Sequence, residues 1–137
     1  MIPKFRAWDK RQNAMRDVAV LHFTKSGKVN SIEYWKTPSE LKSYHVRNIE
    51  LMQSTGLKDK NGVEIFEGDI VAVENHPFQR KEDSSAGMEI EGDYAVGWNQ
   101  HDLTWCAGDL LLARLKPYVR VIGNIYENPE LLEEVKE

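Results

Sequence analysis

Cysteine is almost absent from this chain of 137 residues, and Cys106 is its single example. One cysteine excludes an internal disulfide framework and fits a reducing compartment. Free cysteines in folded proteins are usually small buried hydrophobic residues. We therefore expect Cys106 to be buried and not to act as a nucleophile.

Long apolar runs are also missing. No stretch approaches the roughly 20 apolar residues that a membrane-spanning helix needs. The opening residues, MIPKFRAWDK, lack the apolar segment of a secretory signal peptide. We therefore expect no membrane partner and a cytoplasmic location.

Patterns typical of catalysis or of metal binding are scarce. The four histidines, His22, His45, His76 and His101, are scattered along the chain. His101 lies five residues before Cys106, but two further ligands for zinc are missing. There is no glycine-rich phosphate loop and no serine–histidine–aspartate signature. The sequence therefore predicts no metal, no cofactor and no catalytic residues.

The densest group of carboxylates lies in the central stretch and comprises Asp59, Glu64, Glu67 and Asp69. Hydrolytic or metal-dependent chemistry would need two or three of them to converge on one point. Asp59 precedes an Asn-Gly pair and Asp69 follows a glycine, and in such places aspartate commonly bonds the backbone amides of a turn. We favour turn formation over catalysis for both residues.

Charge is unevenly distributed. The chain has a net charge of −4, yet residues 1–60 carry 12 Lys/Arg against 6 Asp/Glu, whereas residues 61–137 carry 6 against 16. Such asymmetry can mark a basic face for an anionic partner, or two oppositely charged faces that meet. Alternatively, the halves interleave in one domain and the surface charge averages out.

Most of the chain has the alternating pattern of short β-strands separated by turns. We expect strands at residues 4–9, 14–24, 28–35, 46–53, 63–66, 70–73, 94–98, 103–107 and 118–126. Asn61-Gly62 is a strong hairpin signal because both residue types tolerate positive φ.

Four other segments are irregular or helical. Thr37-Pro38-Ser39 breaks the β pattern, and Ser39 could cap a short helical turn through Glu40 and Leu41. Residues 110–115 could be a strand or a helical turn. Residues 76–92 lack periodicity and predict a mobile loop. Residues 128–137 predict a short helix, with Asn128 as its N-cap and Pro129 in its first turn.

Three blocks of sequence carry a resemblance to a known family: KFRAWDK at 4–10, QSTGLKDKNGVEIFEGDIV at 53–71 and VIGNIYENPELL at 121–132. In this order and spacing they resemble the YopX family, small proteins encoded by bacteriophages and prophages. Ser54 stands where the family commonly has an aromatic residue. The resemblance implies a mainly β protein whose later part folds like a small SH3-type barrel, in a bacterial host cell. It implies no reaction and no catalytic residues.

Together these observations predict a single mainly β domain over residues 1–137. It would consist of an N-terminal β extension (1–50), an SH3-like barrel (51–127) and a short C-terminal helix (128–137). We expect a non-enzymatic phage or prophage accessory protein that acts by binding, either as a homo-oligomer or on a host or phage protein.

Nucleic-acid binding is the alternative function. Interleaved basic and aromatic residues near the start and lysines in the central loop could hold phosphates and stack on bases. The acidic total, with a pI of about 5.6, argues against it. For either function we expect the partner-binding surface to include Lys58, Lys60, Trp8 and Arg6.

Overall fold

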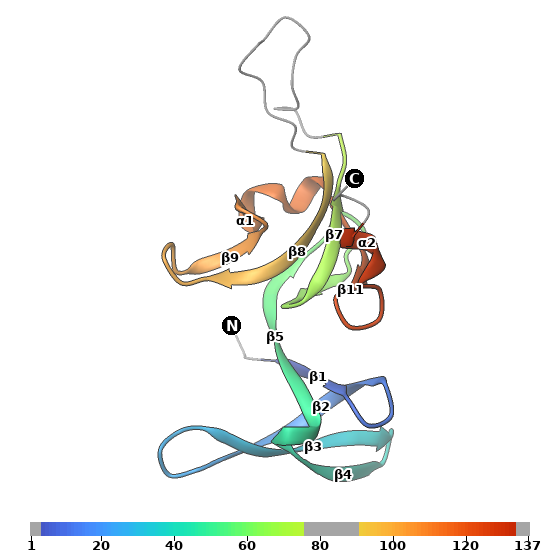
Figure 1. Ribbon diagram of the computed structural model, residues 1–137, viewed down its shortest axis with the longest axis vertical. Coiled ribbons are helices and arrows are strands. Elements are labelled where there is room, and N and C mark those ends of the chain that lie inside the picture. The colour runs from blue at the N-terminus through green and yellow to red at the C-terminus, as the bar shows by residue number, and fades with distance from the viewer. Residues whose placement is uncertain (1–3, 76–90, 134–137) are drawn as a thin grey trace, which may run out of the picture. The chain divides into compact units, whose positions relative to one another are not determined.

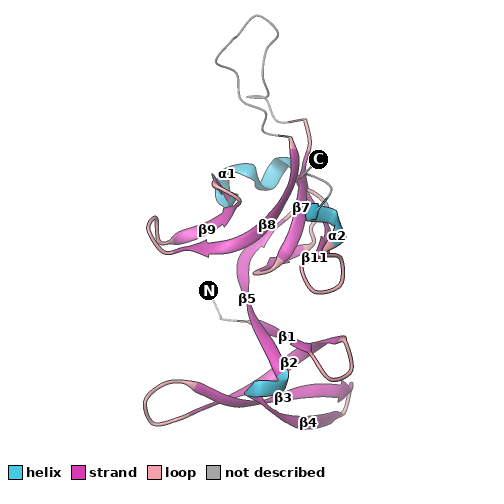
Figure 2. Cartoon of the chain, in the orientation of Figure 1, coloured by secondary structure: helices cyan, strands magenta, loops and turns pink. Residues whose placement is uncertain are grey.

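The computed structural model describes residues 4–75 and 91–133, and within them the protein is mainly β (Figure 1, Figure 2). The chain divides into two compact units, Met1–Ser54 and Thr55–Glu137. Their boundary falls inside the central stretch, within strand β5 (Ile49–Lys58). The predicted mainly β class is confirmed. The expectation of one folding domain stays a prediction, and the predicted loop at 76–92 lies almost wholly outside the described residues.

The first unit is an antiparallel sheet in which consecutive strands pair, with β5 added beside β1. Its elements are β1 (Phe5–Asp9), β2 (Ala14–Phe23), β3 (Val29–Thr37), β4 (Glu40–His45) and the 3₁₀ turn η1 (Val46–Asn48). Successive side chains along a strand point to opposite faces of the sheet, so apolar residues at every second position lie on the same face. Its core is formed by Ala7, Ile32, Tyr34 and Ile49.

The hairpin between β1 and β2 is built around a buried carboxylate. Asp9 is 0% exposed, and its Oδ1 accepts hydrogen bonds from the amides of Arg11 (3.0 Å) and Gln12 (3.1 Å). Its Oδ2 lies 3.3 Å from the Arg16 guanidinium. The predicted turn after the first strand is therefore confirmed, and Asp9 stabilises it by bonding the local backbone.

Strand β4 replaces the helical turn that the sequence suggested after Ser39. Leu41 pairs with Trp35 and Tyr44 pairs with Ile32 across the β3–β4 ladder. The Tyr44 ring packs edge-on against Tyr34 with 5.5 Å between centroids. The prediction was wrong because β4 has few apolar residues of its own, so the neighbouring strand determines its conformation.

The second unit contains a five-stranded antiparallel sheet in the order β10-β9-β8-β7-β11. Its strands are β7 (Asp69–Val73), β8 (Gly92–Asn99), β9 (Thr104–Ala107), β10 (Leu110–Leu111) and β11 (Val119–Asn124), and β6 (Glu64–Phe66) is placed next to β5. Every residue of β7 is buried. Within the described residues, no strand pairing closes this sheet into a barrel. The predicted mainly β class is confirmed, and the SH3-like barrel stays a prediction.

The segment at 110–115, which the sequence predicted as either a strand or a helical turn, contains a short strand followed by a helical turn. Strand β10 leads directly into α1 (Leu112–Leu115) and then into the 3₁₀ turn η2 (Lys116–Tyr118). Leu112 and Leu115 are buried in the core of the second unit. Periodicity cannot separate two elements so short.

The predicted C-terminal helix is confirmed as α2 (Glu130–Glu133), and residues 134–137 lie outside the described part. The predicted N-cap, Asn128, has another role. Its side-chain oxygen accepts a hydrogen bond from the amide of Asn124, 3.2 Å away. Asn128 therefore stabilises the turn that joins β11 to α2.

Candidate binding site in the second unit

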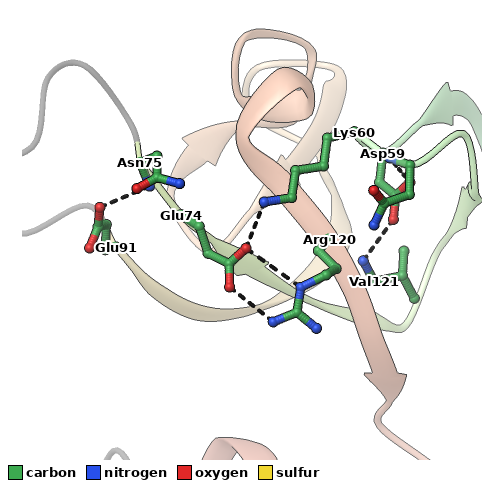
Figure 3. A network of polar contacts seen from close by, with 8 residues as sticks. Asp59, Lys60, Glu74, Asn75, Glu91, Arg120 and Val121 are labelled. Carbon is green, nitrogen blue, oxygen red and sulfur yellow. Dashed lines mark hydrogen bonds and ion pairs between the residues drawn. The ribbon is translucent and has the colours of Figure 1, made fainter.

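A cluster of charged side chains connects the end of β7 with β11 and with the turn after β5. Glu74 directly follows β7, and its carboxylate lies between two cations (Figure 3). Its Oε2 is 2.9 Å from the Arg120 guanidinium and its Oε1 is 2.7 Å from the Lys60 ammonium. Hydrogen bonds from Arg120 and then from Lys60 lower the pKa of Glu74 to about 2. Glu74 is therefore ionised at neutral pH, and its negative charge offsets part of the positive charge of Arg120 and Lys60.

Asp59 anchors the turn that carries Lys60. It is only 6% exposed. Its Oδ1 accepts hydrogen bonds from the amides of Asn61 and Val63, each at 2.8 Å. Its Oδ2 accepts one from the amide of Val121 at 2.9 Å (Figure 3). Burial alone would raise the pKa of Asp59, but the three amides and Lys60 outweigh burial and hold it below its usual value. This is turn formation, as the sequence predicted.

Asp69 has the same kind of role. It is 2% exposed, and its Oδ2 accepts a hydrogen bond from the amide of Phe66 at 2.8 Å. Both aspartates of the central stretch thus bond the backbone of the turns on either side of β6. A carboxylate whose oxygens accept hydrogen bonds from backbone amides is stabilised as an anion, and it is therefore a poor general base.

A hollow of about 470 Å³ lies beside the Asp59 turn. The end of β5, the turn and the start of η2 form its wall, which comprises Gly56, Leu57, Lys58, Asp59, Lys60, Lys116 and Pro117. Gly56 has a φ of 79°, a conformation that favours glycine, and it puts no side chain over the hollow. Three lysines therefore face a concave surface that is open to solvent.

The four residues predicted as a partner-binding surface belong to different units. Lys58 and Lys60 are exposed in the second unit, at the hollow. Arg6 and Trp8 lie on β1 in the first unit, where Arg6 is partly buried and Trp8 is only 9% exposed. Trp8 thus offers little of its ring to a partner. Because the two lysines lie in one unit and Arg6 and Trp8 in the other, neither unit contains all four residues.

Sequence reasoning missed Lys116, which completes the wall of the hollow. It lies 56 residues after Lys60, in a segment where strand and helix could not be distinguished. The contact between Glu74 and Arg120 was also missed, because only the pairing of β7 with β11 brings these residues together. No local pattern marks a contact that depends on strand pairing.

Within the described part of the chain, which does not include His76, the residues considered for metal or nucleophilic chemistry do not gather into a site. Cys106 is 3% exposed, as expected, and burial raises the pKa of its thiol. His101 is exposed and contacts Asp102 at 3.1 Å. Within residues 4–75 and 91–133, no three side chains of histidine, cysteine, aspartate or glutamate are grouped to hold a metal ion.

The comparison with family models gives a match to the YopX protein family over residues 4–133. The chain belongs to the YopX family. Its fold is also similar to the crystal structure of protein EF1440 from Enterococcus faecalis, with 30% sequence identity and a TM-score of 0.66. That similarity covers 96% of this chain and 99% of EF1440. No curated protein matches the sequence.

This YopX-family chain separates its charge between its two units. The first unit carries 10 Lys/Arg against 5 Asp/Glu, a net charge of +5, and the second carries 8 against 17, a net charge of −9. The division of charge thus follows the division into units. The reason is that the chain crosses between the units once, inside β5, so each half folds largely on itself.

In the part of the chain that the structure describes, no helix is long and apolar enough to span a membrane.

Proposed function

We propose that this YopX-family protein is a phage or prophage accessory protein that acts in the bacterial cytoplasm by binding, and that it associates with further copies of itself. The observation that carries the proposal is the coincidence of the charge division with the division into units. A unit of +5 on one copy attracts a unit of −9 on another.

Exposed apolar residues on both units supply contact area for this association. On the first unit, Trp35 is 46% exposed and its cross-strand neighbour Leu41 is 40% exposed, with Lys36 next in sequence. On the second unit, Trp98 is 47% exposed and Leu103 is 67% exposed at the β8–β9 hairpin. Large side chains in such positions are frequent at protein interfaces.

The pairing of unlike surfaces determines the kind of assembly. A basic unit that binds an acidic unit forms a heterologous contact, and the resulting pair of copies still offers one free surface of each sign. Such contacts close into a ring or continue as an open chain. Two copies can also join both pairs of unlike units in a closed dimer, whereas larger rings and open chains contain more copies.

Sedimentation velocity of the full-length protein at two salt concentrations tests the proposal. The Debye length falls from about 10 Å at 0.1 M salt to about 3 Å at 1 M. We expect oligomers at 0.1 M salt, more of them as protein concentration rises, and a monomer at 1 M. A monomer under both conditions, up to the highest soluble concentration, would contradict the proposal.

Nucleic-acid binding is the second candidate, supported by the surplus of +5 on the first unit. Lysines of that unit would contact phosphates, and the binding would weaken steeply with salt. A mobility shift at low salt with single- and double-stranded oligonucleotides tests it. A shift that disappears in the Lys25→Gln, Lys28→Gln, Lys36→Gln triple variant supports it, and no shift at low salt excludes it.

A further inference from the structure

The hollow beside the Asp59 turn concentrates positive charge within an acidic unit. Five of the eight Lys/Arg residues of the second unit lie in its described part, and three of them, Lys58, Lys60 and Lys116, line this one hollow. A fourth, Arg120, binds the same carboxylate as Lys60. Cations so grouped in a unit of net charge −9 create a local field opposite to that of their surroundings.

The carboxylate in the wall cancels only part of this field, because Asp59 brings one negative charge to a hollow lined by three lysines. The Asp59 carboxylate accepts three hydrogen bonds from backbone amides, which stabilise its negative charge and hold it in the turn. Lys58 and Lys116 are both exposed, and among residues 4–75 and 91–133 neither takes part in an ion pair. Two ammonium groups at the hollow are thus available to an anion.

The third lysine can also turn towards a ligand without leaving an uncompensated charge. Lys60 contacts Glu74, but Arg120 contacts the same carboxylate through both Nη2 (2.9 Å) and Nε (3.5 Å). Glu74 therefore keeps a cationic partner if Lys60 moves. The amide of Lys60 donates to the carbonyl of Val119 at 3.0 Å, which fixes the base of the side chain at the rim.

We propose that this hollow binds a phosphate-bearing ligand through Lys58, Lys60 and Lys116. The ligand chemistry is that of a compact polyphosphate, such as pyrophosphate or the phosphate chain of a nucleotide. Lysines act on phosphate as point charges. Salt limits their field to about 8 Å at physiological strength, so the acidic remainder of the unit repels a long polyanion more than a short one.

Titration calorimetry of the full-length protein with inorganic pyrophosphate at low salt tests this site. We expect one site per chain, with the affinity lowered about 5- to 10-fold by Lys58→Ala or Lys116→Ala and further by the double variant. Arg114→Ala is the matched control, because Arg114 is an exposed cation of the same unit that does not line the hollow. It should leave the affinity within about 2-fold of the wild type.

A second titrant distinguishes the sources of phosphate. A 12-residue single-stranded oligonucleotide should bind more weakly than pyrophosphate per phosphate group. Tighter binding of the oligonucleotide, lost on substitution of first-unit lysines, would overturn the compact-ligand proposal in favour of nucleic acid. Absence of pyrophosphate binding, or equal losses in Arg114→Ala and Lys116→Ala, would overturn the site itself. Self-association is measured separately by sedimentation and does not depend on this result.

Discussion

The carboxylate of Asp59 accepts a hydrogen bond at 2.9 Å from the amide of Val121, 62 residues further along the chain. This contact joins two of the sequence blocks on which the resemblance to the family was based, 53–71 and 121–132. The same carboxylate also bonds the amides of Asn61 and Val63. One side chain therefore shapes the turn after β5 and fixes that turn to β11, and this positions Lys60 at the hollow.

Removal of this carboxylate should destabilise the second unit. Asp59→Ala leaves three amides without their acceptor, and we expect a loss of about 3 kcal/mol in the free energy of unfolding. Hydrogen exchange of the Val63 and Val121 amides should accelerate at the same time. Asp109→Ala, which removes an exposed carboxylate of the same unit, should change stability by less than about 0.5 kcal/mol. Equal stability of the two variants would mean that the Asp59 contacts do not support the fold.

Glu74 should make the stability of the second unit depend on pH in the acidic range. Its pKa is about 2 in the folded protein and ordinarily 4.5. A group whose pKa is lowered by folding contributes stability above its unfolded pKa, and the contribution is lost as pH falls from about 4.5 towards about 2. Urea unfolding at pH 7 and pH 3 should therefore show a smaller pH effect for Glu74→Gln than for the wild type.

Titration of the Glu74 carboxylate by NMR separates the two cations. Arg120 makes the larger contribution to the lowered pKa. Arg120→Ala should therefore raise the pKa of Glu74 more than Lys60→Ala does. A wild-type pKa near 4.5, or the reverse order of the two variants, would contradict the network as described.

Two strand glycines of the second unit should respond oppositely to alanine. A Cβ on Gly123 in β11 would lie 2.4 Å from the side-chain oxygen of Asn128, which the Asn124 amide holds in place. We expect Gly123→Ala to lose about 1–3 kcal/mol by overpacking. A Cβ on Gly97 in β8 meets nothing within 4 Å, so Gly97→Ala should be neutral or slightly stabilising. Thermal unfolding of both variants checks the contrast, and equal losses would refute it.

Much of the fold could be predicted because the strands carry their own signals. Alternation located β1, β2, β3 and the last strand, and the Asn61-Gly62 pair located the turn between β5 and β6. The roles of Asp59 and Asp69 followed from the residues beside them. In each case the deciding interaction lies within a few positions in the sequence.

The remainder depends on partners distant in sequence. Strand β4 has too few apolar residues to indicate a strand without β3. The side chain of Asn128 accepts a hydrogen bond from the preceding Asn124 amide, and only its backbone carbonyl bonds the helix that follows. The hollow needs Lys116 to lie beside Lys58 and Lys60, which only the packing of η2 achieves. In the sequence, the division into units was visible only as a change from a basic first half to an acidic second half. Two halves that interleave in one domain would give the same change.

Charge exchange between the two units tests self-association most directly. One full-length variant carries Lys25→Glu, Lys28→Glu and Lys36→Glu on the first unit, and a second carries Asp102→Lys and Asp109→Lys on the second unit; all five positions are exposed. At 0.1 M salt we expect each variant alone to associate less than the wild type, because the first variant changes the net charge of its first unit from +5 to −1 and the second variant lowers that of its second unit from −9 to −5. Sedimentation of their equimolar mixture should show a one-to-one complex that dissociates at 1 M salt. Two variants that remain monomeric when mixed, or that associate alone as the wild type does, would contradict assembly through oppositely charged units.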